Sequence, residues 1–148
     1  MMRRQCRPTA GFAALLRAQP LDASQRTDMG AAYWICFQAL QSGHPSGDAW
    51  GTVTSAINMA LLLTEQGICA DQTGTLKAAQ PALMRARARG LKSDKWGLDG
   101  EGITAIAAAL HVHDAQLAAA KQGQITKALA DLRGRLECGH VLRDDVVA

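Results

Sequence analysis

The chain has 148 residues, the size of one ordinary domain, and a net charge of +3. Hydrophobic residues make up 48% and charged residues 20%, which is a globular composition and excludes a disordered tail or a collagen. A chain of this length buries enough surface to fold without a metal or a disulfide staple. It is rich in alanine and only 4% aromatic, so the composition favours helices over sheet.

The first half of the chain predicts a basic arm followed by helices. The expected elements are a flexible basic arm at 1–8, helices at 9–18 and 22–41, a loop at 42–47, and a third helix that begins at Ser46 or Asp48 and extends to residue 67. Asp22 or Ser24 would cap the second helix, in which Tyr33, Cys36 and Leu40 share one face. The third helix is apolar on nearly all sides, which indicates a buried position, and Gly67 would end it.

The second half predicts shorter elements. They are a helix at 72–89, a loop at 90–101, helices at 102–110, 114–122 and 125–137, and a loose tail at 139–148. Pro81 should kink or divide the helix at 72–89, because proline lacks a backbone N–H. We therefore expect an all-α fold in which residues 9–138 form a single bundle of five to seven helices.

Residues 103–118 (ITAIAAALHVHDAQLA) match the pattern of a helix-turn-helix, with the turn at 111–113. The residues expected to hold this hairpin are Ile106, Ala107, Leu110, Val112 and Leu117. Gln116, Lys121 and Gln122 would then face DNA, since glutamine can pair with adenine. Two residues depart from the pattern: His111 replaces the usual turn glycine, and Asp114 would repel phosphate. A helical hairpin without DNA would leave the same apolar pattern.

The segment WGLDGEGITAIAAALHVHDAQL, together with the helix around Trp50, resembles small plasmid and prophage proteins of proteobacteria. Some of these are labelled Fis-family transcriptional regulators. The resemblance implies a regulatory protein of a bacterial mobile element that contacts DNA.

A basic strip precedes this segment. Between residues 77 and 95 lie six basic residues and one acidic residue. The strip residues expected to neutralise phosphate are Arg85, Arg87, Arg89, Lys92 and Lys95. Trp96 beside them could stack on a base. The alternative is a solvated helix end, where basic side chains complement the helix dipole.

No pattern indicates catalysis or a cofactor. The chain has no glycine-rich phosphate loop and no nucleophile turn. His111-x-His113 and Cys138-x-His140 do not match a zinc signature, so we expect no bound metal. Since no catalytic motif is present either, we expect that the protein is not an enzyme. No apolar run is long enough to span a membrane. The cysteines are widely spread without a CxxC, which favours a cytoplasmic location.

Two functions follow from these patterns. The first is a small regulatory protein that contacts double-stranded DNA through the hairpin and the basic strip. The second is a helical protein–protein interaction module, with a homodimer as one form, whose contact would be an exposed apolar stripe near Trp34, Phe37 or Trp50.

Overall fold

Helices joined by short connections make up the computed structural model, which describes residues 10–42 and 44–138. The α-helices are α1 (Ala10–Ala18), α2 (Ala23–Ser42), α3 (Gly47–Glu65), α4 (Thr73–Ser93), α5 (Gly100–Ala119) and α6 (Gln122–Glu137). A 3₁₀ turn, η1 (Ala70–Gln72), precedes α4. The expected all-α bundle of five to seven helices is confirmed. The arm at 1–8 and the tail at 139–148 lie outside the described residues.

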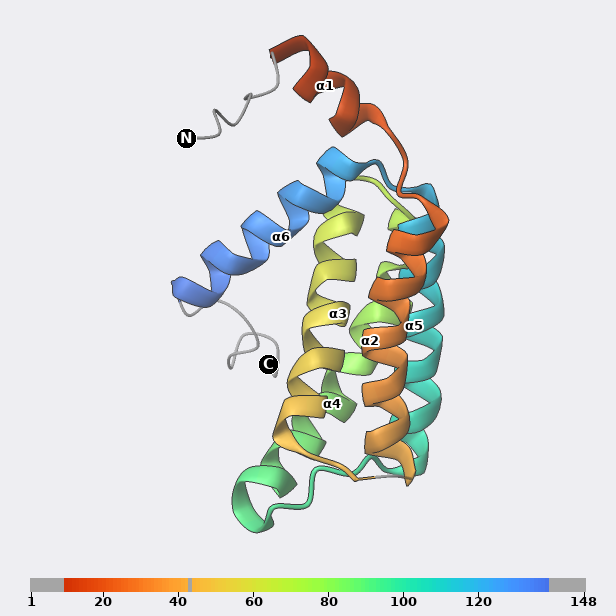
Figure 1. Ribbon diagram of the computed structural model, residues 1–148. Coiled ribbons are helices and arrows are strands. Elements are labelled where there is room, and N and C mark those ends of the chain that lie inside the picture. Colours follow the sequence, from red (N-terminus) through yellow and green to blue (C-terminus); the bar gives the residue numbers. More distant parts are fainter. Residues whose placement is uncertain (1–9, 43, 139–148) are drawn as a thin grey trace.

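Helix α3 is the centre of the bundle. It packs against α2, α4, α5 and α6, while α4 and α5 form the most extensive single pair. Figure 1 shows α2, α3, α4 and α5 lying side by side, with α6 crossing obliquely at one end and α1 next to the start of α6. The oblique α6 covers part of α3 that the other helices leave open.

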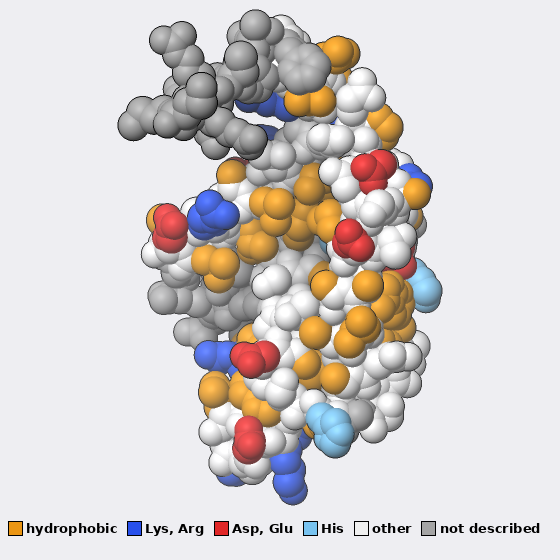
Figure 2. Space-filling view, in the orientation of Figure 1, with side chains coloured by type: hydrophobic (Ala, Val, Ile, Leu, Met, Phe, Trp, Pro, Cys, Tyr) orange, Lys and Arg blue, Asp and Glu red, His pale blue; other side chains and the backbone are white. Residues whose placement is uncertain are grey.

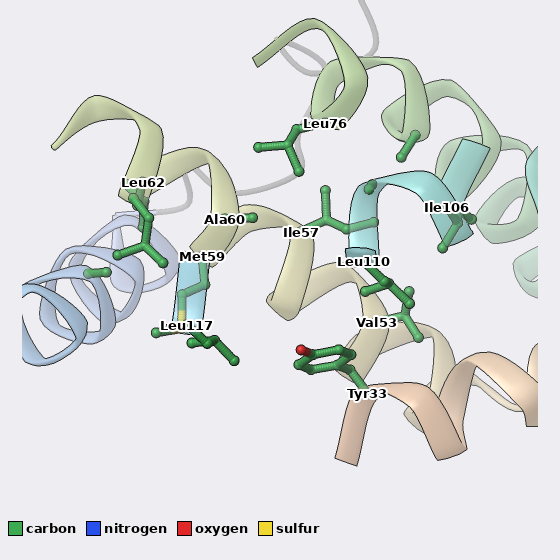
Figure 3. Close-up of a cluster of buried hydrophobic side chains, with 14 of the residues drawn as sticks. Tyr33, Val53, Ile57, Met59, Ala60, Leu62, Leu76, Ile106, Leu110 and Leu117 are labelled. Carbon is green, nitrogen blue, oxygen red and sulfur yellow. The ribbon is translucent and has the colours of Figure 1, made fainter. Parts of the chain in front are cut away.

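The core explains this central position. Val53 and Ile57 on α3 are fully buried, and Figure 3 shows them near Ile106 and Leu110 of α5 and Leu76 of α4. Burial of each such aliphatic side chain contributes about 1.5–3 kcal/mol relative to exposure. Because α3 is apolar on nearly all sides, it needs partners on all sides, as its sequence predicts.

Local sequence fixes where the helices begin and end. Asp22 Oδ1 accepts from the backbone N–H of Gln25, whose Oε1 accepts from the N–H of Asp22, so the two form a capping box on α2. Ser46 caps α3 through the N–H of Ala49. Gly67 follows α3 with φ +85°, a backbone conformation that glycine adopts without strain, as expected.

The helix-turn-helix expected at 103–118 is wrong. Helix α5 runs without interruption from Gly100 to Ala119, through the residues assigned to the turn. No glycine or proline interrupts the chain between 103 and 119, and Ile106, Leu110 and Leu117 with His113 form one continuous buried seam. The chain turns only at Ala120 and Lys121, after which α6 packs on α3 and α1 instead of returning onto α5.

Helix α4 also extends beyond its predicted limits. Pro81 lies inside it on an exposed position and does not divide it. The helix continues to Ser93, so the connection to α5 spans only residues 94–99 rather than 90–101. The short loop brings Asp99 close to α4, which becomes important for the basic strip.

Candidate functional site

The eight residues predicted to contact DNA have different surroundings in the structure. Gln116 is fully buried, and its Nε2 donates to the carbonyl oxygens of Ala60, at 2.9 Å, and Ile68, at 3.1 Å. Its Oε1 lies 3.2 Å from Nδ1 of His113, one turn earlier on α5. The expectation that Gln116 faces DNA is therefore wrong, because this amide joins α5 to α3 and to the loop that follows α3.

Lys121 and Gln122 lie at the opposite end of the bundle from Lys95. Helix α5 separates them, and its 20 residues span about 30 Å at 1.5 Å per residue. The N–H of Gln122 donates to the carbonyl of Gln19 at 2.8 Å, and Lys121 pairs with Pro20 in an isolated bridge. Lys121 and Gln122 thus hold the connection between α1 and α2, and they do not form one surface with the basic strip.

Two arginines of the basic strip hold the loop at 94–99. Arg85 donates to Asp99 through Nε at 2.9 Å, and Arg89 donates to the carbonyl of Gly97 at 2.6 Å. Asp99 also caps α5 by accepting from the N–H of Gly102. The hydrogen bond from Arg85, together with that from Gly102, holds the pKa of Asp99 below its ordinary value. Arg85 and Arg89 therefore have a structural role at the junction of α4 and α5.

Trp96 packs onto the protein at the same junction. Its ring lies 5.8 Å from that of Trp50 and covers Gly90 so closely that a Cβ there would lie 2.5 Å from Cε3. Its Nε1 donates to Asp94 at 3.0 Å. Gly90 is buried in α4, where only the absence of a side chain lets the indole approach. Trp96 fastens the loop in this arrangement, and base stacking would require it to leave this packing.

Three cations of the predicted strip remain exposed. Arg87, Lys92 and Lys95 make no ion pair with any described residue. Arg87 and Lys92 lie in the last two turns of α4 and Lys95 follows the helix, and Asp94 is the nearest acidic residue in sequence. This smaller group, which we call the α4 end, is the part of the basic strip that can meet a polyanion.

The outward side of α2 is an uncharged surface. The charged residues of α2, Arg26 and Asp28, lie near the beginning of the helix, so its outward side from Ala31 onward carries no charge. Figure 2 shows apolar side chains gathered over α2. Ile35 is 65% exposed, an unusual position for an isoleucine in a helix otherwise packed against the core. We call this surface the α2 face: Ala31, Ala32, Ile35, Gln38 and Ser42 are exposed on it, and the half-buried Ala39, which also packs against the core, lies at its edge.

A polar cluster joins α2 to α5 beside this face. Asp114 accepts hydrogen bonds from the hydroxyl of Tyr33 and from Nε1 of Trp34, which lies 3.0 Å from Oδ2. Burial, with the hydrogen bond to Asp114, raises the pKa of Tyr33 above its ordinary range. The sequence reasoning missed this cluster, because the partners lie 80 and 81 residues apart and no local pattern connects them.

The two histidines expected not to bind metal face different neighbours. His113 is buried against the ring of Tyr33 and bonds Gln116, whereas His111 is exposed and lies 4.9 Å from the ring of Trp34. Within residues 10–42 and 44–138, no group of three or more His, Cys, Asp or Glu side chains is placed to hold a metal ion. In the same residues, no helix is long and apolar enough to cross a membrane.

The chain matches no protein-family model, no curated protein and no solved structure. The resemblance of the segment around α5 to Fis-family proteins therefore stays an expectation from sequence. The geometry of the α4 end, the α2 face and the Asp114 cluster is what supports a functional proposal.

Proposed function

We propose that the protein is a helical interaction module that pairs with a second copy of itself through the α2 face. The observation that carries the proposal is an exposed helical surface without charge, centred on Ile35. A buried isoleucine gains about 1.5–3 kcal/mol over an exposed one, so this side chain favours a partner that covers it.

Charge and shape both favour a second copy as that partner. Each chain carries a net charge of +3, and an uncharged surface lets two copies meet without placing like charges in direct contact. Small residues, Ala31, Ala32 and Ala39, surround Ile35, and small side chains let two helices approach closely. In a two-fold arrangement the same face serves both partners, and Ile35 meets the corresponding residues of the other copy.

The pairing should be weak. The α2 face extends over 12 residues, about 18 Å of helix at 1.5 Å per residue. One helix face of this length is smaller than the roughly 800 Å² that each partner buries in a standard interface. We therefore expect a dimer that forms and dissociates with concentration instead of a permanent one.

Sedimentation velocity over a range of protein concentrations tests the proposal. Ile35→Glu should leave the protein monomeric, because it places two carboxylates against each other across the interface. Leu91→Glu is the matched control: Leu91 is 66% exposed, Ile35 is 65% exposed, and Leu91 lies near the end of α4, away from the α2 face. A protein that stays monomeric at all concentrations, or a dimer that both variants weaken equally, would contradict the proposal.

The α4 end supports a second candidate function, which is binding to nucleic acid. Arg87, Lys92 and Lys95 are exposed and free to neutralise phosphate. Fluorescence anisotropy with duplex DNA at several salt concentrations tests this candidate. Replacing all three residues by Glu should abolish binding, and the salt dependence of the unmodified protein should correspond to about three phosphate contacts. Binding that is unchanged in the triple variant would rule out the α4 end.

A further inference from the structure

A surface hollow lies beside Asp114, where the start of α2 meets the last turns of α5. Its volume is about 300 Å³, at the lower limit of small-molecule sites. The residues that line it are Ala23, Arg26, Thr27, Asp114, Leu117 and Ala118. They belong to the first turns of α2 and to α5, so the hollow is separate from the α2 face.

The carboxylate of Asp114 is held in a fixed orientation. Tyr33 and Trp34 donate to it from α2, Nδ1 of the exposed His111 lies 3.9 Å from its Oδ2, and the side chain is still 40% exposed. Each carboxylate oxygen can accept more than one hydrogen bond, so Asp114 keeps acceptor capacity toward the hollow. A ligand therefore meets a carboxylate that needs no reorganisation, and preorganisation of this kind favours binding.

Arg26 supplies the opposite charge in the same hollow. Its side chain is half-buried and makes no hydrogen bond or ion pair with the described part of the chain. In particular, its guanidinium lies more than 4.0 Å from Asp114, although both residues line the hollow. A molecule that carries both charges would therefore find an opposite charge for each of them in this hollow of about 300 Å³.

We infer that this hollow binds a small zwitterion, an amino-carboxylate whose ammonium group meets Asp114 and whose carboxylate meets Arg26. Arginine binds carboxylates through two parallel hydrogen bonds, which gives this end of the ligand a defined orientation. The exposed Ala23 and Ala118 offer apolar contact for a short carbon chain between the two charged groups, with the almost fully buried Leu117 beneath them. The hydroxyl of Thr27 adds one polar contact.

The indole N–H of Trp34 provides a direct readout, because it donates to the same carboxylate that the ligand would meet. We would record nitrogen–proton correlation spectra of the full-length protein, assign this resonance with Trp34→Phe, and titrate β-alanine at constant ionic strength. The resonance should shift saturably. Propylamine and propionate, which carry only one of the two charges, should bind at least about tenfold more weakly, since a charged hydrogen bond is worth a tenfold change or more.

Substitution of Arg26 separates a ligand site from a structural role of Asp114. Arg26→Gln removes the charge without touching Tyr33, Trp34 or Asp114, so the fold and the unbound spectrum should persist. It should weaken binding of β-alanine about tenfold or more. Lys77→Gln, a change at an exposed cation on α4, is the control and should have no effect. An absent or non-saturable shift, equal binding of propylamine, or unchanged affinity in Arg26→Gln would each overturn the inference.

Discussion

Replacement of Gly90 by alanine tests how the loop at 94–99 is fastened. Within a helix, alanine is more favourable than glycine by about 1 kcal/mol, so helix propensity alone predicts stabilisation. In this protein the new Cβ would lie 2.5 Å from Cε3 of Trp96 and closer still to Cδ2. Carbon atoms in contact are about 3.5–4.0 Å apart, so the indole must move by about 1 Å or more.

The cost follows from the packing that Trp96 loses. Loss of a fully buried tryptophan costs about 3–5 kcal/mol, and Trp96 is only half-buried, so displacement of its ring should cost about 2–3 kcal/mol. After the gain in helix propensity, Gly90→Ala should destabilise the protein by about 1–2 kcal/mol. For a chain of this size, the melting temperature should fall by about 2–8 °C.

Gly51→Ala is the matched control for this prediction. Gly51 also lies inside a helix, α3, but a Cβ there would meet nothing within 4 Å. This variant should therefore be more stable by about 1 kcal/mol. Urea unfolding followed by circular dichroism measures both changes. If Gly90→Ala is as stable as Gly51→Ala, Trp96 does not hold the loop in the way described.

Three further predictions concern polar residues. Burial lowers the pKa of His113, so below about pH 6.5 the unfolded state binds more protons than the folded state. As the pH decreases through this range, the free energy of unfolding should therefore fall by up to about 1.4 kcal/mol per pH unit. His113→Gln should flatten this dependence between about pH 5 and 7 in urea titrations, and a slope that persists would assign it to other groups. Tyr33→Phe removes the hydroxyl donor to Asp114 and should cost about 1–3 kcal/mol of stability, so an unchanged urea midpoint would contradict this role. Arg89→Ala breaks the bond to Gly97 and should cost about 1 kcal/mol, whereas Arg87→Ala should change stability by less than about 0.5 kcal/mol in the same assay.

The sequence predicted the helices better than the breaks between them. The capping pattern at Asp22, the cap at Ser46 and the glycine at Gly67 all stand where local chemistry placed them. The turn at 111–113 was wrong, because short apolar repeats fit either one long helix or two short ones. In the continuous helix, His113 and Gln116 lie one turn apart and can bond to each other. The side-chain amide of Gln116 also donates to the carbonyl of Ala60, a contact that exists only because α3 packs against α5.

For a related reason, the sequence could not distinguish the strip residues that bond the loop from those that stay exposed. A basic strip along one helix looks the same in sequence whether its arginines face solvent or a neighbouring loop. Arg85 donates to Asp99, and Arg89 donates to the carbonyl of Gly97. Only the short loop between α4 and α5 brings these groups together. Arg87 and Lys92 on α4, and Lys95 within the loop itself, remain exposed and donate neither to Asp99 nor to the carbonyl of Gly97.

By itself, the sequence determined that the chain folds into helices, where most of them begin, and that α3 is buried. These properties depend on composition, capping and periodicity, which act within a few residues of one another. Tertiary structure alone decided that Gln116 is buried, that Tyr33 and Trp34 meet Asp114, and that Arg26 shares a hollow with Asp114. Each of these contacts joins residues that are distant in the chain, and only the packing of α2, α3 and α5 brings them within reach.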